Sequence, residues 1–165
     1  MIKIEELSKA HNRNDFDCGQ DYLNKYLKHT ARQHIDKGIS RTYVLIDVSE
    51  PSTILGFYTI SVCEIKSESI PDPYRIKYPH VIPGAKLARL AVHKDYFRQG
   101  KGKKLMVHAM EKAILVAETT GIVGFFVDAK DEEAIQYYKQ YGFISFPNNR
   151  LTMFLPLDTL RSAFS

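Results

Sequence analysis

The chain has 165 residues, enough for one domain with a substantial hydrophobic core. Hydrophobic residues make up 44% and charged residues 25%, which is ordinary for a soluble protein, and no run of about 18 apolar residues is present to cross a membrane. The formal net charge of +4 favours anionic partners but does not name one.

The first residues of the chain show no signal-peptide pattern, and its cysteines show no pattern of a metal or redox site. Residues 1–10 alternate apolar and charged side chains and lack the apolar core of a signal peptide. The two cysteines, Cys18 and Cys63, have neither metal-binding nor redox spacing. We therefore expect a protein without a metal, in a reduced, cytoplasmic setting.

The first elements are expected to be a short strand over residues 2–7 and an amphipathic helix. Asp17, followed three residues later by Gln20, predicts a capping box at the start of a helix that ends at Gly38. Its basic face would carry Lys25, Lys28 and Arg32. Such a stripe is most often a solvated face, and contact with an anionic substrate or partner is the alternative.

A β-hairpin and a long connection are expected next. Residues 41–48 and 54–65 are rich in β-branched and aromatic side chains and are separated by a turn. The following stretch is broken by prolines, which predicts a long loop of the kind that often carries binding function. These prolines are Pro71, Pro73, Pro79 and Pro83.

The second half predicts alternating strands and helices. Residues 86–92 form a strand, and a helix beginning near Gly100 stops at Gly121. Residues 122–127 are almost wholly apolar, as in a strand covered on both faces. Asp131 can cap a last helix that ends at Gly142. Residues 143–146 and 151–157 then complete a strand pair.

This element order predicts a single domain over residues 1–165. Its fold class is mixed α/β (α+β), with a central twisted sheet of about six to seven strands flanked by helices on both faces. The strand at 86–92, its helix and the strand at 122–127 form one right-handed crossover. A ligand is expected beyond the carboxyl ends of these two strands, beside the glycine-rich turn.

That turn reads Phe97-Arg98-Gln99-Gly100-Lys101-Gly102-Lys103-Lys104. Gly100 and Gly102 would allow positive φ and close approach of the backbone, and the helix N-terminus would attract an anion. A P-loop would need Lys-Ser/Thr after the last glycine, and a dinucleotide fingerprint would need a third glycine. A phosphate-bearing ligand of another kind fits, and a basic solvated turn is the alternative.

The loop resembles the acyl-CoA pyrophosphate loop of the GNAT N-acetyltransferases, (Gln/Arg)-x-x-Gly-x-(Gly/Ala), with Phe97 at the position usually held by Gln or Arg. Residues 137–143 resemble the (Phe/Leu)-Tyr-x-x-x-Gly-Phe segment of these enzymes, which makes Tyr138, and not Tyr141, the equivalent tyrosine. A core aromatic is the alternative role for Tyr138. Residues 16–19, 40–44, 87–92, 117–121 and 151–157 resemble the branch that contains the aminoacyl-tRNA-acetylating toxins of bacterial toxin–antitoxin pairs.

The resemblance implies a GNAT-like fold and acetyl-CoA as the co-substrate, without a metal. Tyr138 would protonate the leaving thiolate, because a phenol with a pKa near ~10 is protonated at neutral pH. A backbone N–H near Val92 could stabilise the oxyanion. The residues implied in acetyl-CoA binding are Leu90, Ala91, Val92, Gln99, Gly100, Lys101, Gly102 and Lys103.

The acceptor implied by the toxin branch is the α-amine of aminoacyl-tRNA. No general base stands out beyond His93 and Glu64, and an α-amine needs less help to lose its proton than a lysine does. The cysteines lack a base partner, which disfavours a covalent intermediate. Phosphates of the tRNA would be bound by Lys25, Lys28, Arg32, Arg41 and Arg89.

The branch also implies a homodimer and a small ribbon-helix-helix antitoxin as partners, with no membrane association. Two other functions are compatible with these residues. One is acetylation of a small amine, a polyamine or a protein amine by the same fold. The other is a non-catalytic CoA-binding module, for which the departure at Phe97 leaves room.

Overall fold

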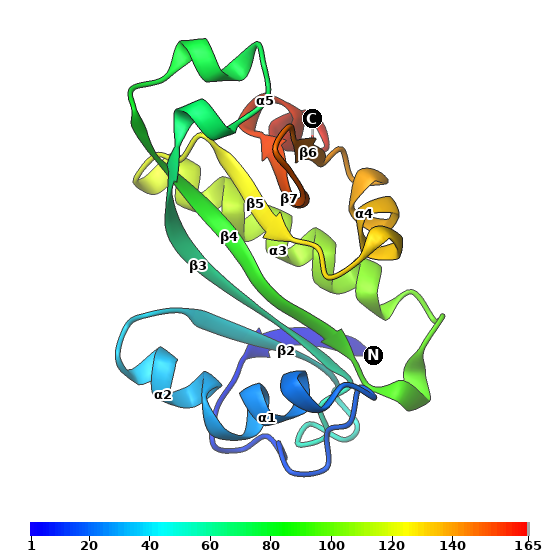
Figure 1. Ribbon diagram of the computed structural model, residues 1–165. Coiled ribbons are helices and arrows are strands. Elements are labelled where there is room, and N and C mark those ends of the chain that lie inside the picture. Colours follow the sequence, from blue (N-terminus) through cyan, green and yellow to red (C-terminus); the bar gives the residue numbers. More distant parts are fainter. Residues whose placement is uncertain (165) are drawn as a thin grey trace. The chain divides into compact units, whose positions relative to one another are not determined.

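The computed structural model describes residues 1–164 and contains a seven-stranded sheet of strand order β1-β2-β3-β4-β5-β7-β6 (Figure 1). Strands β4 and β5 are parallel, and the pairs β1–β2, β2–β3, β5–β7 and β6–β7 are antiparallel. The pairs β2–β3 and β6–β7 are the two predicted hairpins. The mixed α/β class is therefore confirmed. The elements are β1 (Ile2–Glu6), α1 (Asp21–His29), α2 (Ala31–Asp36), β2 (Arg41–Asp47), β3 (Gly56–Lys66), β4 (Val81–Val92), α3 (Lys101–Thr119), β5 (Gly124–Asp128), α4 (Glu132–Lys139), β6 (Ile144–Phe146), β7 (Asn149–Pro156) and α5 (Leu157–Ser162).

The chain folds as two compact units. The first consists of Met1–Ser61 and Ala88–Ala109, and the second consists of Val62–Leu87 and the chain from Met110 onward. Strands β3 and β4 and helix α3 contribute residues to both units. The single domain over residues 1–165 stays a prediction.

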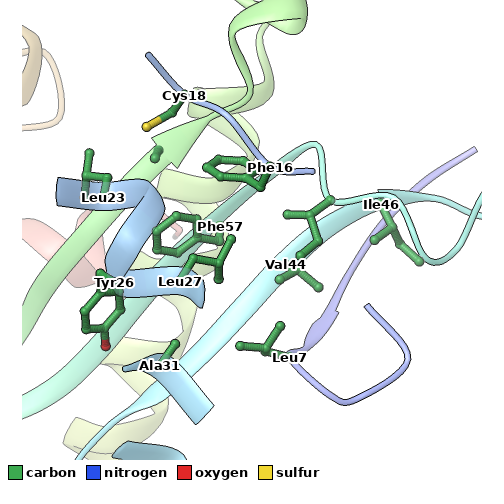
Figure 2. Close-up of a cluster of buried hydrophobic side chains, with 12 residues drawn as sticks. Leu7, Phe16, Cys18, Leu23, Tyr26, Leu27, Ala31, Val44, Ile46 and Phe57 are labelled. Atoms are coloured by element: carbon green, nitrogen blue, oxygen red, sulfur yellow. The ribbon is translucent and has the colours of Figure 1, made fainter. Parts of the chain in front are cut away.

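In the first unit, neighbouring residues of β3 face two different layers, because successive side chains of a strand point to opposite faces. Phe57 is fully buried and packs edge-on against Phe16 and parallel to Tyr26 of α1 (Figure 2). Tyr58 faces the other way, and its hydroxyl hydrogen-bonds Nδ1 of His108 on α3 at 2.6 Å. Helix α1 and the first half of α3 thus cover opposite faces of this part of the sheet.

The predicted helix from Asp17 to Gly38 is wrong in two respects. Helix α1 begins at Asp21 with Gln20 as N-cap and no side-chain cap, because the Asp17 carboxylate accepts the Gly19 N–H instead. The helix is also interrupted at Thr30, whose φ of −120° separates α1 from α2. Gly38 terminates α2 as expected, with a φ of +74°.

The second unit buries an aromatic cluster on one face of its strands. Phe126 of β5 and Phe154 of β7 are register partners whose rings stack with centroids 4.9 Å apart. Gly84 of β4 lies against the Phe126 ring, where an added Cβ would overlap it. Ile70 and Ile82 complete this face of the core.

The opposite face of the second unit carries Phe125, which packs against Phe143 with centroids 5.9 Å apart. Phe143 in turn contacts the ring of Tyr138 on α4 at 5.7 Å. The cap of α4 is the one predicted, since Asp131 Oδ1 accepts the Ala134 N–H at 2.9 Å. The ring of Tyr138 on α4 therefore packs against the buried ring of Phe143, which itself packs against Phe125.

Several boundaries differ from those expected from sequence. Strand β4 begins at Val81 rather than residue 86, so Pro83 lies inside the strand and not in the loop. Its fixed φ suits an extended strand, and its carbonyl accepts the Val123 N–H at 3.0 Å. Residue 157, expected to end the last strand, instead begins the short helix α5, which the sequence analysis did not predict.

Candidate functional site: a helix N-terminus fitted to a pyrophosphate

The turn between β4 and α3 is built by two residues with left-handed backbone conformation. Arg98 has a φ of 61° and Gly100 a φ of 77°, and α3 begins directly afterwards at Lys101. Among residues 1–164, Arg98 is the one non-glycine residue with positive φ. The turn therefore holds Arg98 in a backbone conformation that is unfavourable for a residue with a Cβ. The positive φ expected for Gly102 is wrong, because Gly102 lies within the first turn of α3.

The first turn of α3 presents backbone donors. The Lys104 N–H donates to the Gly100 carbonyl at 3.2 Å, which is the first i→i−4 bond of the helix. The N–H groups of Lys101, Gly102 and Lys103 come before it and have no acceptor within the helix. Together with the positive end of the helix dipole, they form a site suited to an anion.

The side chains around this turn add positive charge. Arg98, Lys103 and Lys104 are exposed. The Lys101 ammonium lies 5.6 Å from the centroid of the Tyr96 ring and donates to Gln99 Oε1 at 3.3 Å. These groups suit a phosphate-bearing ligand. Phe97 is 51% exposed and offers no polar atom to it.

Strand β4 continues past its ladder with β5. The parallel pairs are Ala85–Phe125, Lys86–Phe126 and Leu87–Val127. Residues 88–92, which include Leu90, Ala91 and Val92, follow that ladder and belong to the first unit. Alternate peptide groups of such a strand segment can pair with an extended ligand, as when a peptide adds to a sheet edge.

The five basic residues expected to bind tRNA all belong to the first unit, but they lie on different elements. Lys25 and Lys28 are on α1, and Lys25 pairs with Asp21 at 3.0 Å. Arg32 lines a cavity of about 360 Å³ between α2 and residues 7–10. Arg41 is exposed on β2, and Arg89 of β4 stacks over the Tyr26 ring.

Tyr138 lies in the second unit, on the last turn of α4, and is half-buried. Its ring contacts Tyr137 at 5.3 Å and Phe143 at 5.7 Å. The Tyr141 hydroxyl is engaged differently, since it lies 3.2 Å from that of Tyr137. Burial, and then this hydrogen bond, raise the pKa of Tyr137 well above its usual range.

One of the two candidate bases, His93, is oriented unfavourably for that role. His93 Nδ1 accepts the Asp95 N–H at 3.1 Å, so in the neutral ring the proton resides on Nε2. Nε2 then has no lone pair with which to accept a proton from an amine. Glu64 is exposed and lines a polar cavity of about 590 Å³ in the second unit.

The contact between Asp17 and the residues that follow β4 was not predicted from the sequence. Asp17, expected to cap a helix, forms an ion pair with Lys94, which follows directly after β4 and His93. The Asp-x-Gly pattern at residues 17–19 is a local signal for the bond from the Gly19 N–H to the Asp17 carboxylate, because a short carboxylate readily accepts the N–H two residues on, but it does not indicate Lys94.

Across residues 1–164, no cluster of three or more histidine, cysteine, aspartate or glutamate side chains is arranged to hold a metal ion. In the same part of the chain, every helix is too short or too polar to cross a membrane.

Comparison with known proteins identifies the family. An acetyltransferase (GNAT) domain profile matches residues 38–145. The tRNA-acetylating toxin of Mycobacterium tuberculosis (strain ATCC 25618 / H37Rv) is 26% identical, over 94% of this chain and 92% of the toxin. A solved structure of AtaT complexed with acetyl-methionyl-tRNAfMet is 32% identical, covers 100% of both chains and superposes with a TM-score of 0.90.

A tyrosine-to-phenylalanine mutant of the AtaT toxin has been solved bound to the C-terminus of the antitoxin AtaR and acetyl-CoA. It is 30% identical, over 99% of this chain and 98% of that chain, with a TM-score of 0.82. The domain profile covers well over half of the chain, and the similarity to AtaT extends over its whole length. The chain therefore belongs to the acetyltransferase (GNAT) family and resembles its tRNA-acetylating toxins.

Proposed function

We propose that this chain transfers the acetyl group of acetyl-CoA to the α-amine of an aminoacyl-tRNA and thereby blocks translation. The observation that carries the proposal is the open first turn of α3, preceded by the left-handed turn at Arg98 and Gly100. That arrangement suits the pyrophosphate of a coenzyme A. Similarity to AtaT over the whole chain supports both the donor and the acceptor.

Within this proposal, the backbone around Leu90, Ala91 and Val92 binds the pantetheine arm. The first turn of α3, with Gln99, Gly100, Lys101, Gly102 and Lys103, binds the pyrophosphate. The amine nitrogen attacks the thioester carbonyl, and a backbone N–H near Val92 stabilises the oxyanion. An N–C bond forms, the C–S bond breaks, and the nitrogen loses its proton to solvent.

Tyr138 is the proposed acid that protonates the departing thiolate. Its half-buried position, on rings that anchor it to the core, supports a fixed orientation. Tyr141 is a weaker candidate, because Tyr138 and not Tyr141 lies four residues before Gly142, as in the family's segment. The direct transfer needs no covalent intermediate on the enzyme.

An α-amine is the more suitable acceptor, because His93, one of the residues considered as general bases, offers little help in removing a proton. His93 is held in a tautomer that cannot accept a proton at Nε2, and an α-amino group has a larger neutral fraction at pH 7 than a lysine. The tRNA phosphates would be bound by Lys25, Lys28, Arg32, Arg41 and Arg89 of the first unit. We further propose that the chain forms a single domain, that it assembles into a homodimer, and that it acts in the cytoplasm.

A relative, AtaT, binds the C-terminus of the antitoxin AtaR. By analogy, we propose that a small ribbon-helix-helix antitoxin neutralises this chain. Co-expression of the neighbouring small gene with the acetyltransferase should then restore growth, whereas an unrelated small DNA-binding protein should not.

The central test is acetylation in vitro. Purified protein and labelled acetyl-CoA are incubated with tRNAs charged with each amino acid, with uncharged tRNA as control. Labelled acetyl-aminoacyl-tRNA should appear for at least one amino acid. If label appears instead only on polyamines or protein lysines, the acceptor is wrong; if acetyl-CoA binds calorimetrically without turnover on any amine, the chain is a binding module.

A further inference from the structure

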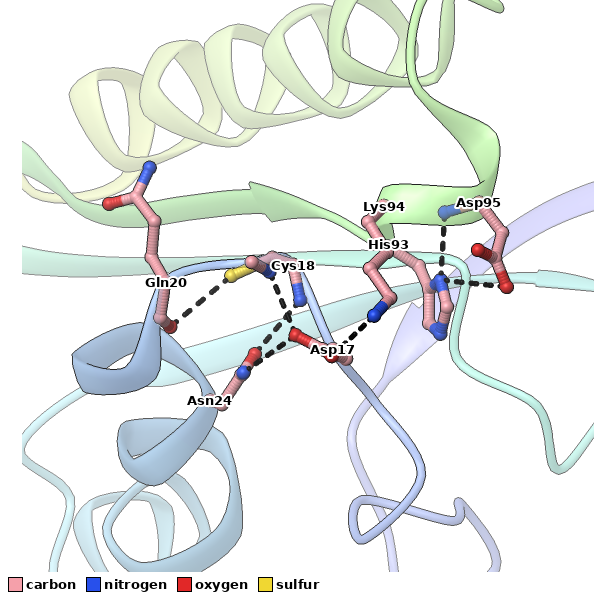
Figure 3. A network of polar contacts seen from close by, with 8 residues as sticks. Asp17, Cys18, Gln20, Asn24, His93, Lys94 and Asp95 are labelled. Carbon is pink, nitrogen blue, oxygen red and sulfur yellow. Dashed lines mark hydrogen bonds and ion pairs between the residues drawn. The ribbon is translucent and has the colours of Figure 1, made fainter.

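The motif Phe16-Asp17-Cys18-Gly19 has no role in the function proposed so far. In the structure it precedes α1 and lies against residues 93–95, between β4 and the pyrophosphate loop (Figure 3). All these residues belong to the first unit. The motif therefore joins an element that carries basic residues, α1, to the loop expected to bind coenzyme A.

The Asp17 carboxylate is the centre of the polar contacts. Its Oδ1 accepts the Gly19 N–H at 2.8 Å and the Asn24 side-chain amide at 3.0 Å. Its Oδ2 lies 3.0 Å from the Lys94 ammonium. Asn24 Oδ1 in turn accepts the Cys18 N–H at 2.9 Å, so α1 is bound to the motif in two ways.

A main-chain bond and a row of rings run beside these contacts. The Lys94 N–H donates to the Asp17 carbonyl at 2.8 Å. The Phe16 ring contacts the His93 ring at 5.8 Å, and the His93 ring contacts Tyr96 at 5.7 Å. Tyr96 lies below the ammonium of Lys101, the first residue of α3. Contacts are thus continuous from the start of α1 to the start of α3.

We propose that Asp17 is a positioning residue, which fixes α1 relative to the coenzyme loop so that the acceptor held by α1 meets the thioester in a reactive geometry. The proposal rests on the proposed function. It does not place Asp17 on either substrate. Misplacement of reacting atoms by about 1 Å can cost ~100-fold in rate, so the effect should appear in kcat and not in binding.

The test compares four single variants of the full chain and the double variant of Asp17→Asn with Lys94→Met. Asp17→Asn keeps an acceptor oxygen for Gly19 but removes the charge that Lys94 contacts, and Asp17→Ala removes both. Lys94→Met removes the same ion pair from the other side and leaves the main-chain bond. Asp21→Asn is the matched control, because Asp21 is an acid of the same helix end whose ion-pair partner is Lys25.

Steady-state kinetics are measured with charged tRNA and acetyl-CoA after thermal unfolding confirms that each variant is folded. We expect Asp17→Ala to lower kcat about tenfold or more, with KM for either substrate changed by less than about twofold. Asp17→Asn and Lys94→Met should each lower kcat less, and their double variant should equal one single variant. Asp21→Asn should keep the parental kcat, and any effect of releasing Lys25 should appear only in KM for the charged tRNA.

Amide hydrogen exchange provides a readout that does not require turnover. Acetyl-CoA should slow exchange at residues 100–104 in every variant, and at residues 17–24 only where Asp17 is intact. A folded Asp17→Ala variant with parental kcat, or with slowed exchange still transmitted to residues 17–24, would overturn the proposal. If the parent protein acetylates no charged tRNA, the proposed function fails, while the exchange experiment still tests the coupling.

Discussion

The guanidinium of Arg89 lies over the ring of Tyr26, with 4.6 Å between Cζ and the ring centroid. One of its terminal nitrogens donates to the Ala88 carbonyl at 2.8 Å. Its Nε is buried and makes no hydrogen bond with the described residues. Arg89 is thus oriented by the protein on one side, and in the proposed function its remaining terminal donors would contact a tRNA phosphate.

Arg89→Lys tests whether this orientation matters beyond charge. The lysine keeps a positive charge but loses the planar stacking and the fixed donors. We expect the Kd for charged tRNA to rise about three- to tenfold, in line with the strength of a partly buried cation–π contact. Filter binding at fixed ionic strength measures it. The control is Arg13→Lys, which alters a guanidinium bonded to the Lys28 carbonyl at 2.8 Å; equal effects of the two would refute a special role for Arg89.

Tyr138→Phe removes the proposed acid while keeping the ring that packs on Phe143. Loss of general-acid catalysis should reduce kcat about 100-fold or more, and calorimetric affinity for acetyl-CoA should stay unchanged. Tyr141→Phe is the matched control. It loses the contact with the Tyr137 hydroxyl but should retain most of the activity. Parental kcat in Tyr138→Phe would remove this tyrosine from the mechanism.

Gly100→Ala tests the turn that precedes α3. A φ of +77° is unfavourable for alanine by about 1–2 kcal/mol, so the turn should shift and move the N–H groups of the first helical turn. We expect acetyl-CoA affinity to fall about tenfold by calorimetry. Gly38→Ala is closely matched, since Gly38 has a φ of +74° and both sites have open space for a Cβ. Weakened binding in both variants would indicate a general loss of stability instead.

Local signals in the sequence were sufficient for much of the fold. Asp131 caps α4, Gly121 follows α3, and the apolar residues after it form β5, because each of these features depends on residues a few positions apart. The sequence signal for the expected coenzyme loop was local as well. The glycine turn and the helix that follows it are adjacent in sequence, so their geometry could be predicted together.

The errors arise where distant residues decide. Asp17 does not cap a helix, because its carboxylate accepts the Gly19 N–H and also pairs with Lys94, a residue far along the chain. Pro83 was expected to lie in a loop, but it lies within β4 and its carbonyl accepts the Val123 N–H. The stacking of Arg89 on Tyr26 is likewise set by a contact between distant residues that no local pattern encodes.

The ion pair of Asp17 should also make stability depend on pH. The Gly19 N–H, then the Asn24 amide and the Lys94 ammonium, hold the pKa of the Asp17 carboxyl well below its usual 3.8. The folded protein therefore binds fewer protons at this site than the unfolded chain, and the stabilisation is complete above the unfolded pKa. It is lost as the pH falls below that value toward the lower folded pKa.

Asp17→Asn removes this titration and provides the comparison. At about pH 7 its Tm should lie below that of the parent protein, and the difference should shrink as the pH approaches about 3, because the parent carboxyl begins to be protonated on unfolding. Asp21→Asn, which removes an exposed carboxylate paired only within α1, controls for the change in net charge. Thermal unfolding followed by circular dichroism at a series of pH values measures both. A difference in Tm between the parent and Asp17→Asn that stays constant over this range would mean that the Asp17 carboxylate is not stabilised by the contacts seen here.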